Sequence, residues 1–328
     1  MLIENPKTYK GQEVETIFFR PSFCGKSAEE MGIRVLYNMP VPTTVQVWSH
    51  ADNVLQKYAS GWQGGAKSQK FQKTIDMQKV KAETSFSAAD YFSMVFEQIT
   101  GNAEVNMGDL TGTDLEKAET ELFRQAIAES VRATMWLGDT EGKVSSFKTF
   151  DGFLKAIKTA SSEDKLAASG IGYYTYTMDE VTDACQIFDF AWDNASEELK
   201  CLRSEGNLVY FATSDLVRRY ESALDKSAAD AAYRERIEGR PQLFYHGIPI
   251  VEVPLGKYSE EQTYGTEFCI LTDRRNMVLA LNTADMPENE VRMWYNPDEM
   301  ENRQRAVFLA GADILDTRLV SVCMLETE

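Results

Sequence analysis

The chain has 328 residues and a formal net charge of −17, from 51 acidic and 34 basic side chains. This charge repels a polyanion, so the composition argues against a nucleic-acid binder that works by neutralising phosphates. No run of about 18 apolar residues is present, so we expect no membrane span, and the start of the chain lacks the apolar core of a signal peptide. Five scattered cysteines without a Cys-x-x-Cys pair indicate reduced thiols, and neither a disulfide framework nor a zinc site.

The first part of the chain predicts an extended arm over residues 1–38, in which Pro21, Gly25 and Gly32 interrupt any periodicity. The alternative is an ordinary N-terminal strand that packs on its own domain. Residues 39–86 then predict a long β-hairpin with a glycine-rich tip at residues 60–66. On the return strand the apolar residues move from odd to even positions, which predicts a bulge or twist near Gln78 and Lys79.

The most informative stretch is a predicted helix over Leu115–Leu137, roughly 34 Å long. Thr113 and Glu116 have capping-box spacing at its start. We expect Gly138 to end it through a positive φ. The predicted buried stripe of the helix is formed by Leu122, Ala126 and Ile127. A polar, turn-rich segment follows from Asp139 and closes on Phe150-Asp151-Gly152-Phe153-Leu154.

The second half of the chain predicts alternating helices and strands. Thr177 and Glu180 have capping-box spacing ahead of a helix that reaches Leu199, and Ser214 follows an apolar strand and caps the next helix. Residues 243–251 predict two strands about a glycine turn, residues 268–271 and 277–281 predict a strand pair, and long strands close the chain.

No catalytic motif stands out. The two histidines, His50 and His246, are isolated, and neither has a metal-ligand partner at helical spacing. We therefore predict no catalytic, cofactor-binding or metal-binding residues. The many carboxylates could still hide a glycosidase pair, because sequence spacing does not define that geometry.

A long helix that ends in Leu-Gly-Asp, a short loop, and then an Asp-Gly-Phe-Leu segment resembles the major capsid proteins of tailed bacteriophages, the Hong Kong 97-like family. The order of elements over residues 40–325 is similar as well. The resemblance implies an α+β fold with an N-terminal arm (1–38), an extended-loop hairpin (39–86) and a peripheral domain (87–160) that contains the spine helix (115–137). It also implies an axial domain (161–282) and return strands of the peripheral domain (283–328).

The resemblance implies a protein that assembles with itself into hexameric and pentameric capsomers of an icosahedral head. The head would enclose double-stranded DNA without sequence-specific binding, and an acidic wall is compatible with that. Expected partners are a separate scaffolding protein, a portal and decoration proteins. The protein would be made in the host bacterial cytoplasm, would reside in the virion, and would contact no membrane.

The hairpin tip is the predicted contact between subunits, because a large apolar Trp62 beside flexible glycines suits a segment ordered on a neighbour. The predicted interface residues are Trp62, Gly64, Gly65, Lys67 and Lys70. Some members of the family form isopeptide crosslinks through a lysine of the extended loop, but solvated lysines are the commoner explanation for Lys67 and Lys70. Two rival functions stay open: an encapsulin-like nanocompartment shell and a carboxylate-based hydrolase.

Overall fold

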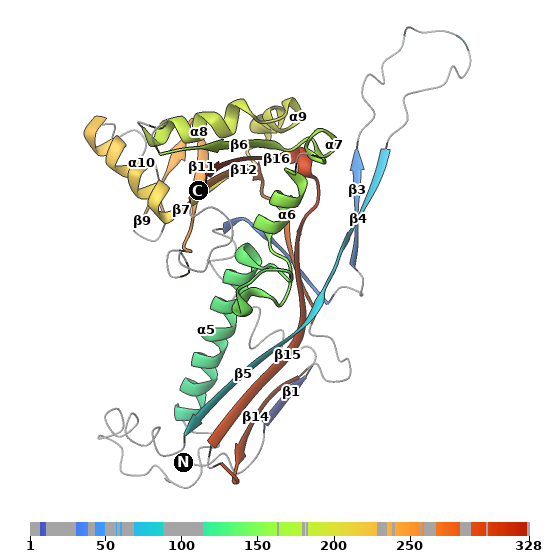
Figure 1. The fold of residues 1–328 in the computed structure, drawn as a ribbon, viewed down its shortest axis with the longest axis vertical. Helices are drawn as coiled ribbons and strands as arrows, with labels where there is room; N and C mark the ends of the chain where they lie inside the picture. The colour runs from blue at the N-terminus through green and yellow to red at the C-terminus, as the bar shows by residue number, and fades with distance from the viewer. Residues whose placement is uncertain are drawn as a thin grey trace.

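The computed structural model describes residues 7–10, 31–38, 43–49, 57, 60, 69–87, 114–162, 164–178, 181, 183–227, 235–237, 240–255, 258, 267–282, 290–299 and 301–326. Within them the chain forms two six-stranded sheets and two separate two-stranded ribbons. The long helix α5 (Asp114–Leu137) lies along one sheet, and several of the shorter helices gather against the other (Figure 1). The predicted mixture of helices and sheets is confirmed.

The first sheet contains the long strand β15 at its centre. Its path runs β1-β14-β15-β13-β2, and β5 pairs with β15 off this path. The strands are β1 (Lys7–Lys10), β2 (Arg34–Tyr37), β5 (Gln78–Ser87), β13 (Met277–Asn282), β14 (Glu290–Asn296) and β15 (Glu301–Ile314).

The second sheet has the order β10-β11-β7-β12-β16-β6. Its strands are β6 (Gly172–Tyr176), β7 (Leu208–Thr213), β10 (Phe244–Tyr245), β11 (Ile248–Val253), β12 (Phe268–Asp273) and β16 (Val320–Leu325). The two ribbons are β3 (Thr43–Ser49) with β4 (Gln69–Ile75), and β8 (Glu235–Ile237) with β9 (Arg240–Gln242). The remaining helices are α6 (Phe153–Ala160), α7 (Leu166–Ser169), α8 (Ala184–Asp193), α9 (Glu197–Cys201) and α10 (Ser214–Ser227), with 3-10 turns at Ser145–Phe147, Leu202–Glu205 and Thr317–Leu319.

Both faces of the second sheet are buried, and they belong to different cores. Along β7, Val209 and Phe211 pack into the core that α5 and the first sheet share. Tyr210 and Ala212 point the other way, into a core formed with α8, α9 and α10. This alternation follows from the two-residue period of a strand, so a strand that reads as continuously apolar serves both layers.

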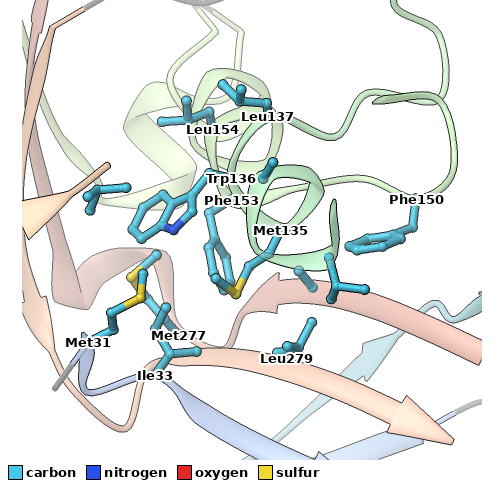
Figure 2. Close-up of a cluster of buried hydrophobic side chains, with 14 of the residues drawn as sticks. Met31, Ile33, Met135, Trp136, Leu137, Phe150, Phe153, Leu154, Met277 and Leu279 are labelled. Carbon is cyan, nitrogen blue, oxygen red and sulfur yellow. The ribbon is translucent and has the colours of Figure 1, made fainter. Parts of the chain in front are cut away.

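The two sheets share one core at the end of α5. Trp136 lies with its ring 5.3 Å from Phe153, 5.5 Å from Phe211 and 5.8 Å from Phe268, so it joins α5 and α6 to two strands of the second sheet. Figure 2 shows Met31, Ile33, Met277 and Leu279, which come from the first-sheet side, gathered near the same helix end. The burial of these large side chains stabilises the junction between the two sheets.

The structure corrects the expected arm. Lys7–Lys10 pairs with β14, and Arg34–Tyr37 pairs with β13, so the described parts of residues 1–38 are strands of the chain's own sheet. This was the alternative reading of the segment. Residues 11–30 lie outside the described part of the chain.

The structure also shortens the predicted hairpin. The chain does return from the tip, but β4 ends at Ile75, and β5 pairs with β15 and not with β3. The predicted change of phase is present at the predicted position: Met77 is buried, Gln78 and Lys79 are both exposed, and Val80 is buried, directly after the break between β4 and β5. The change of phase therefore marks the point where the chain leaves the hairpin and enters the first sheet.

Three further predictions, about strand pairing, a domain boundary and a helix cap, are wrong. β12 and β13 do not pair with each other, because β12 lies in the second sheet and β13 in the first. The predicted domain boundary between residues 282 and 283 separates β13 from β14 and β15, although all three lie in the first sheet. It also groups β16 with β14 and β15, although β16 lies in the second sheet. The cap of α8 is Asp183 with Gln186, and not the Thr177 pair.

Candidate functional site

The β3–β4 hairpin projects from the body of the molecule beyond the first sheet (Figure 1). One predicted interface residue, Lys70, lies in β4 at the position paired with Trp48. The other predicted tip residues lie outside the described part of the chain: Trp62, Gly64, Gly65 and Lys67. Their role between subunits stays a prediction.

The base of the hairpin is fastened to the first sheet by apolar packing. Ile75 is fully buried and Met77 nearly so, and both pack with Val278 and Ala280 of β13. Val45 of β3 packs against the same cluster. The projecting ribbon therefore starts from a fixed base and not from a loose connection.

Two polar features reinforce this base. Lys73 Nζ lies 3.0 Å from Asp313 Oδ2, which joins β4 to β15. Burial raises the pKa of Asp313, and the charge of Lys73 opposes that effect. A Cβ atom at Gly311 would lie 2.3 Å from the carbonyl oxygen of Asp76, so only glycine allows the chain to turn so close to β15. The sequence reasoning missed these residues; a charged Asp313 inside the apolar run of β15 was the available signal.

The segment 138–155, which we call the helix-end turn, folds back against the end of α5. The Gly152 amide donates to the Gly138 carbonyl at 2.8 Å. A Cβ at Gly138 would lie 2.2 Å from the carbonyl oxygen of Phe150 and 2.5 Å from that of Thr134. Gly138 does end the helix, but its φ is not positive. The expected reason was therefore wrong: glycine is needed here because two backbone segments meet.

A lysine and two aspartates close the helix-end turn. Lys155 Nζ lies 2.8 Å from Asp139 Oδ1 and 3.0 Å from Asp151 Oδ1, and its side chain is only 15% exposed. The amide and hydroxyl of Thr140 both donate to Asp151 Oδ1, at 2.9 and 2.8 Å. The arrangement satisfies an ammonium group that is largely withdrawn from water, and it fixes the loop.

The protonation states in this turn follow from the contacts. Burial acts to lower the pKa of Lys155, but the bonds to Asp139 and Asp151 outweigh it and raise the pKa overall. Burial likewise acts to raise the pKa of Asp151, and the bonds from Thr140 and Lys155 lower it overall. Lys155 therefore stays charged at neutral pH, and its ion pairs suit the turn to holding structure.

The predicted stripe of α5 is only partly correct. Ile127 is 3% exposed, and Phe123 and Val131 pack with it in the main core. Leu122 is 55% exposed, and Ala126 is exposed as well. The prediction is wrong for Leu122 and Ala126, because the buried stripe runs one position further along the helix, where residues four apart stack on one face. Thr113, in the predicted capping box, lies outside the described residues.

A second buried polar cluster lies at the end of the second sheet. Tyr176 Oη donates to Glu267 Oε1 at 2.5 Å, and Arg219 Nη1 donates to the same oxygen at 2.6 Å. Burial raises the pKa of Tyr176, and the hydrogen bond to the Glu267 carboxylate raises it further, so the hydroxyl stays protonated. The cluster connects β6 and the start of β12 to α10. The Tyr176 hydroxyl and the Arg219 guanidinium are both hydrogen-bonded to the Glu267 carboxylate.

Among the described residues, no three His, Cys, Asp or Glu side chains are arranged to hold a metal ion. None of the described helices is long and apolar enough to cross a membrane. His246 is exposed in the tight turn between β10 and β11, where it and Gly247 both have positive φ, and His50 lies outside the described residues. The predicted pair of strands about a glycine turn is confirmed.

Comparison with solved structures identifies the fold. A chain of the satellite phage P4 procapsid, in a structure that includes the size determination (Sid) protein, matches with a TM-score of 0.54 and 11% identity over 90% of this chain and 94% of that one. A chain of Gordonia phage Cozz matches with a TM-score of 0.51 and 13% identity over 90% and 85%. No protein-family model and no curated protein matches at the level of sequence. The chain therefore has the fold of phage major capsid proteins.

Proposed function

We propose that the protein is a major capsid protein that assembles with itself into the icosahedral head shell around phage double-stranded DNA. One observation carries the proposal: the fold matches a chain of the satellite phage P4 procapsid over 90% of this chain, with a TM-score of 0.54. The match covers 90% of this chain and 94% of the other, so it concerns most of the fold and not one small substructure.

The parts of the fold have distinct roles in this proposal. The long helix α5 is the spine helix, and the first sheet beneath it forms the peripheral domain. The second sheet with α8, α9 and α10 is the axial domain, which meets its copies at the centres of capsomers. The β3–β4 hairpin is the extended loop and lies across a neighbouring subunit. Its fixed base at Ile75 and Lys73 supports this role, because a ribbon that must reach a neighbour needs a defined direction.

The proposed role is structural and not enzymatic. The lysine in the helix-end turn and the glutamate beside Tyr176 are both taken up by internal partners, which supports this view. The proposed partners are copies of the chain in capsomers of six and five, a separate scaffolding protein, a portal and decoration proteins. The net charge of −17 suits a wall that does not adhere to packed DNA. Synthesis takes place in the cytoplasm of the bacterial host.

Sedimentation of the purified protein tests the proposal. Under assembly conditions, with and without a candidate scaffolding protein, we expect capsomers or shells of many subunits. A profile that contains only a species of 37.0 kDa under every condition would refute the capsid function. The fold would remain, but its role would then have to be sought in a monomer.

A further inference from the structure

Two short connections between the two sheets cross beside each other. In the first crossing, residues 274–276 lead from β12 in the second sheet to β13 in the first. In the second, residues 315–319 lead from β15 in the first sheet to β16 in the second. Because the crossings run in opposite directions through the same place, a bond between them restrains one sheet against the other.

Asn276 makes that bond with both ends of its side-chain amide. Its Oδ1 accepts from the Asp316 amide at 2.8 Å, and its Nδ2 donates to the Asp316 carbonyl at 2.8 Å. The Leu315 amide donates to the backbone carbonyl of Asn276 at 3.0 Å. The residue is 4% exposed, so these bonds are protected from competing water.

The two crossings have the same internal construction. In the first, the Asp273 carboxylate accepts from the Arg275 amide at 2.7 Å and pairs with its guanidinium at 2.7 Å. In the second, the Asp316 carboxylate accepts from the Arg318 amide at 3.0 Å and pairs with its guanidinium at 2.7 Å. Each crossing is therefore a stiff turn by itself, and Asn276 joins two stiff turns.

A second contact across the junction lies beside the first. The Thr272 hydroxyl donates to the Leu319 carbonyl at 2.8 Å, and Asn276 Nδ2 also lies 3.2 Å from that hydroxyl. A side-chain amide, like a hydroxyl, can donate and accept hydrogen bonds at once. An apolar or charged side chain of similar size cannot do both. The polar groups at the junction are thus satisfied in one particular arrangement of the two crossings.

We infer that Asn276 is a positioning residue that fixes the angle between the two sheets, and through that angle the curvature of the shell. The second half of this inference rests on the proposed capsid function. Every subunit of a shell repeats the same angle, so a small change in it is multiplied around the assembly. Loosening the junction should therefore alter the size of the shell before it alters the fold of the subunit.

We call the bonds of Asn276 to Asp316 and Leu315 the clamp. Hydrogen exchange on the unmodified protein tests the clamp without any variant. The Asp316 and Leu315 amides should exchange as slowly as amides inside β16. In Asn276→Ala the Asp316 amide loses its acceptor, and its exchange should become about tenfold faster. Ser321→Ala is the matched control, because it removes another buried bond, from Ser321 Oγ to the Ala191 carbonyl at 2.6 Å, which joins β16 to α8 and does not bridge the two crossings. Fast exchange at Asp316 in the unmodified protein would overturn the clamp.

Electron microscopy of assembled particles tests the effect on curvature. Unmodified protein and Ser321→Ala should give shells of one diameter, and Asn276→Ala should give several diameters or open sheets. Asn276→Asp keeps the side-chain size but loses the donor, and it replaces the alanine variant if that variant does not fold. Asn276 variants with the diameter of the unmodified shell would overturn the inference. If the unmodified protein forms no shells, the proposed function and the curvature claim both fail, while hydrogen exchange still decides the clamp.

Discussion

Two glycines and one lysine hold the helix-end turn against α5. Gly138 and Gly152 let two backbone segments approach more closely than any side chain would allow, and the Gly152 amide bonds across the gap. Lys155 then links the aspartates next to the two glycines, Asp139 after Gly138 and Asp151 before Gly152. The Leu-Gly-Asp and Asp-Gly-Phe-Leu segments are therefore two halves of one contact, which explains their spacing.

The first prediction concerns the glycine contact. Gly138→Ala should destabilise the protein by about 3 kcal/mol or more, because the new Cβ meets backbone atoms that cannot move aside. Gly206→Ala is the comparison: Gly206 has a φ of 75° but nothing within 4 Å of its Cβ position, so it should cost only roughly 1–2 kcal/mol. Urea unfolding measures both. Equal losses would mean that the close contact does not govern the turn.

The second prediction concerns acid stability. The pKa of Asp151 in the folded protein lies below its ordinary value of 3.8, because its bonds to Thr140 and Lys155 outweigh the opposite effect of burial. A lowered pKa stabilises the fold above the unfolded value, and this stabilisation is lost as the pH falls through the folded value. The free energy of unfolding should therefore fall less steeply in Asp151→Asn than in the unmodified protein between about pH 4 and pH 2. Parallel curves would show that Asp151 is not held as described.

The third prediction separates the two sides of α5. Ile127→Ala should lower the free energy of unfolding by about 2–5 kcal/mol, because it empties a space in the main core. Leu122→Ala deletes a side chain of the same size from the exposed side and should change it by no more than about 0.5 kcal/mol. Chemical denaturation of the unassembled subunit measures both values. A larger loss at Leu122 would restore the original assignment of the stripe.

The stripe of α5 shows what periodicity can and cannot predict. The helix and its end at Leu137 follow from apolar spacing and from Gly138, and both agree with the structure. Leu122 with Ala126, and Phe123 with Ile127, are neighbouring diagonals with the same spacing. The spacing is helical in either case, and only the position of the first sheet decides which diagonal is buried.

At the scale of elements, the hairpin is a ribbon with a firm base. The base is held by Ile75 in an apolar cluster, by the Lys73–Asp313 pair and by the close approach of Asp76 to Gly311. None of these contacts involves the tip. The base should therefore keep its structure when the tip is changed.

The fourth prediction follows from that separation. Replacing residues 60–66 by a short polar turn should leave the circular dichroism and the melting temperature of the free subunit nearly unchanged, while closed shells no longer form. Trp62 is the expected cause, because burying an indole on a neighbour contributes a few kcal/mol in each subunit. An unfolded subunit would show that the tip packs on its own core. Normal shells would show that the tip has no role in assembly.

Strand pairing was less predictable than strand position. Alternation marks β4 and β5, and continuous apolar runs mark β12 and β13, so each strand is visible from its own local pattern. It does not reveal that β5 pairs with β15, more than two hundred residues further along the chain, or that β12 and β13 lie in different sheets. Which strands pair depends on how they pack in the core. The short turn between β12 and β13 therefore predicted a hairpin, whereas in the structure it connects two different sheets.

At the scale of the whole molecule, two sheets share one core and are clamped at two crossings. Trp136 fills the junction from the side of α5, and Asn276 closes it from the side of the crossings. The hairpin leaves this body from a fixed base. Such a subunit suits the proposed shell, in which the body keeps one shape and the projecting ribbon is expected to reach a neighbour.

The fifth prediction concerns the assembled protein. A cryo-electron microscopy map of it tests the capsid function and the role of the hairpin together. The map should show closed icosahedral shells, with α5 and both sheets arranged within each subunit as described. The β3–β4 hairpin of each subunit should lie on the adjacent subunit, with Trp62 buried at that contact. Shells in which the hairpin folds back on its own subunit would contradict the proposed role of the hairpin, and the absence of any shell would contradict the capsid function.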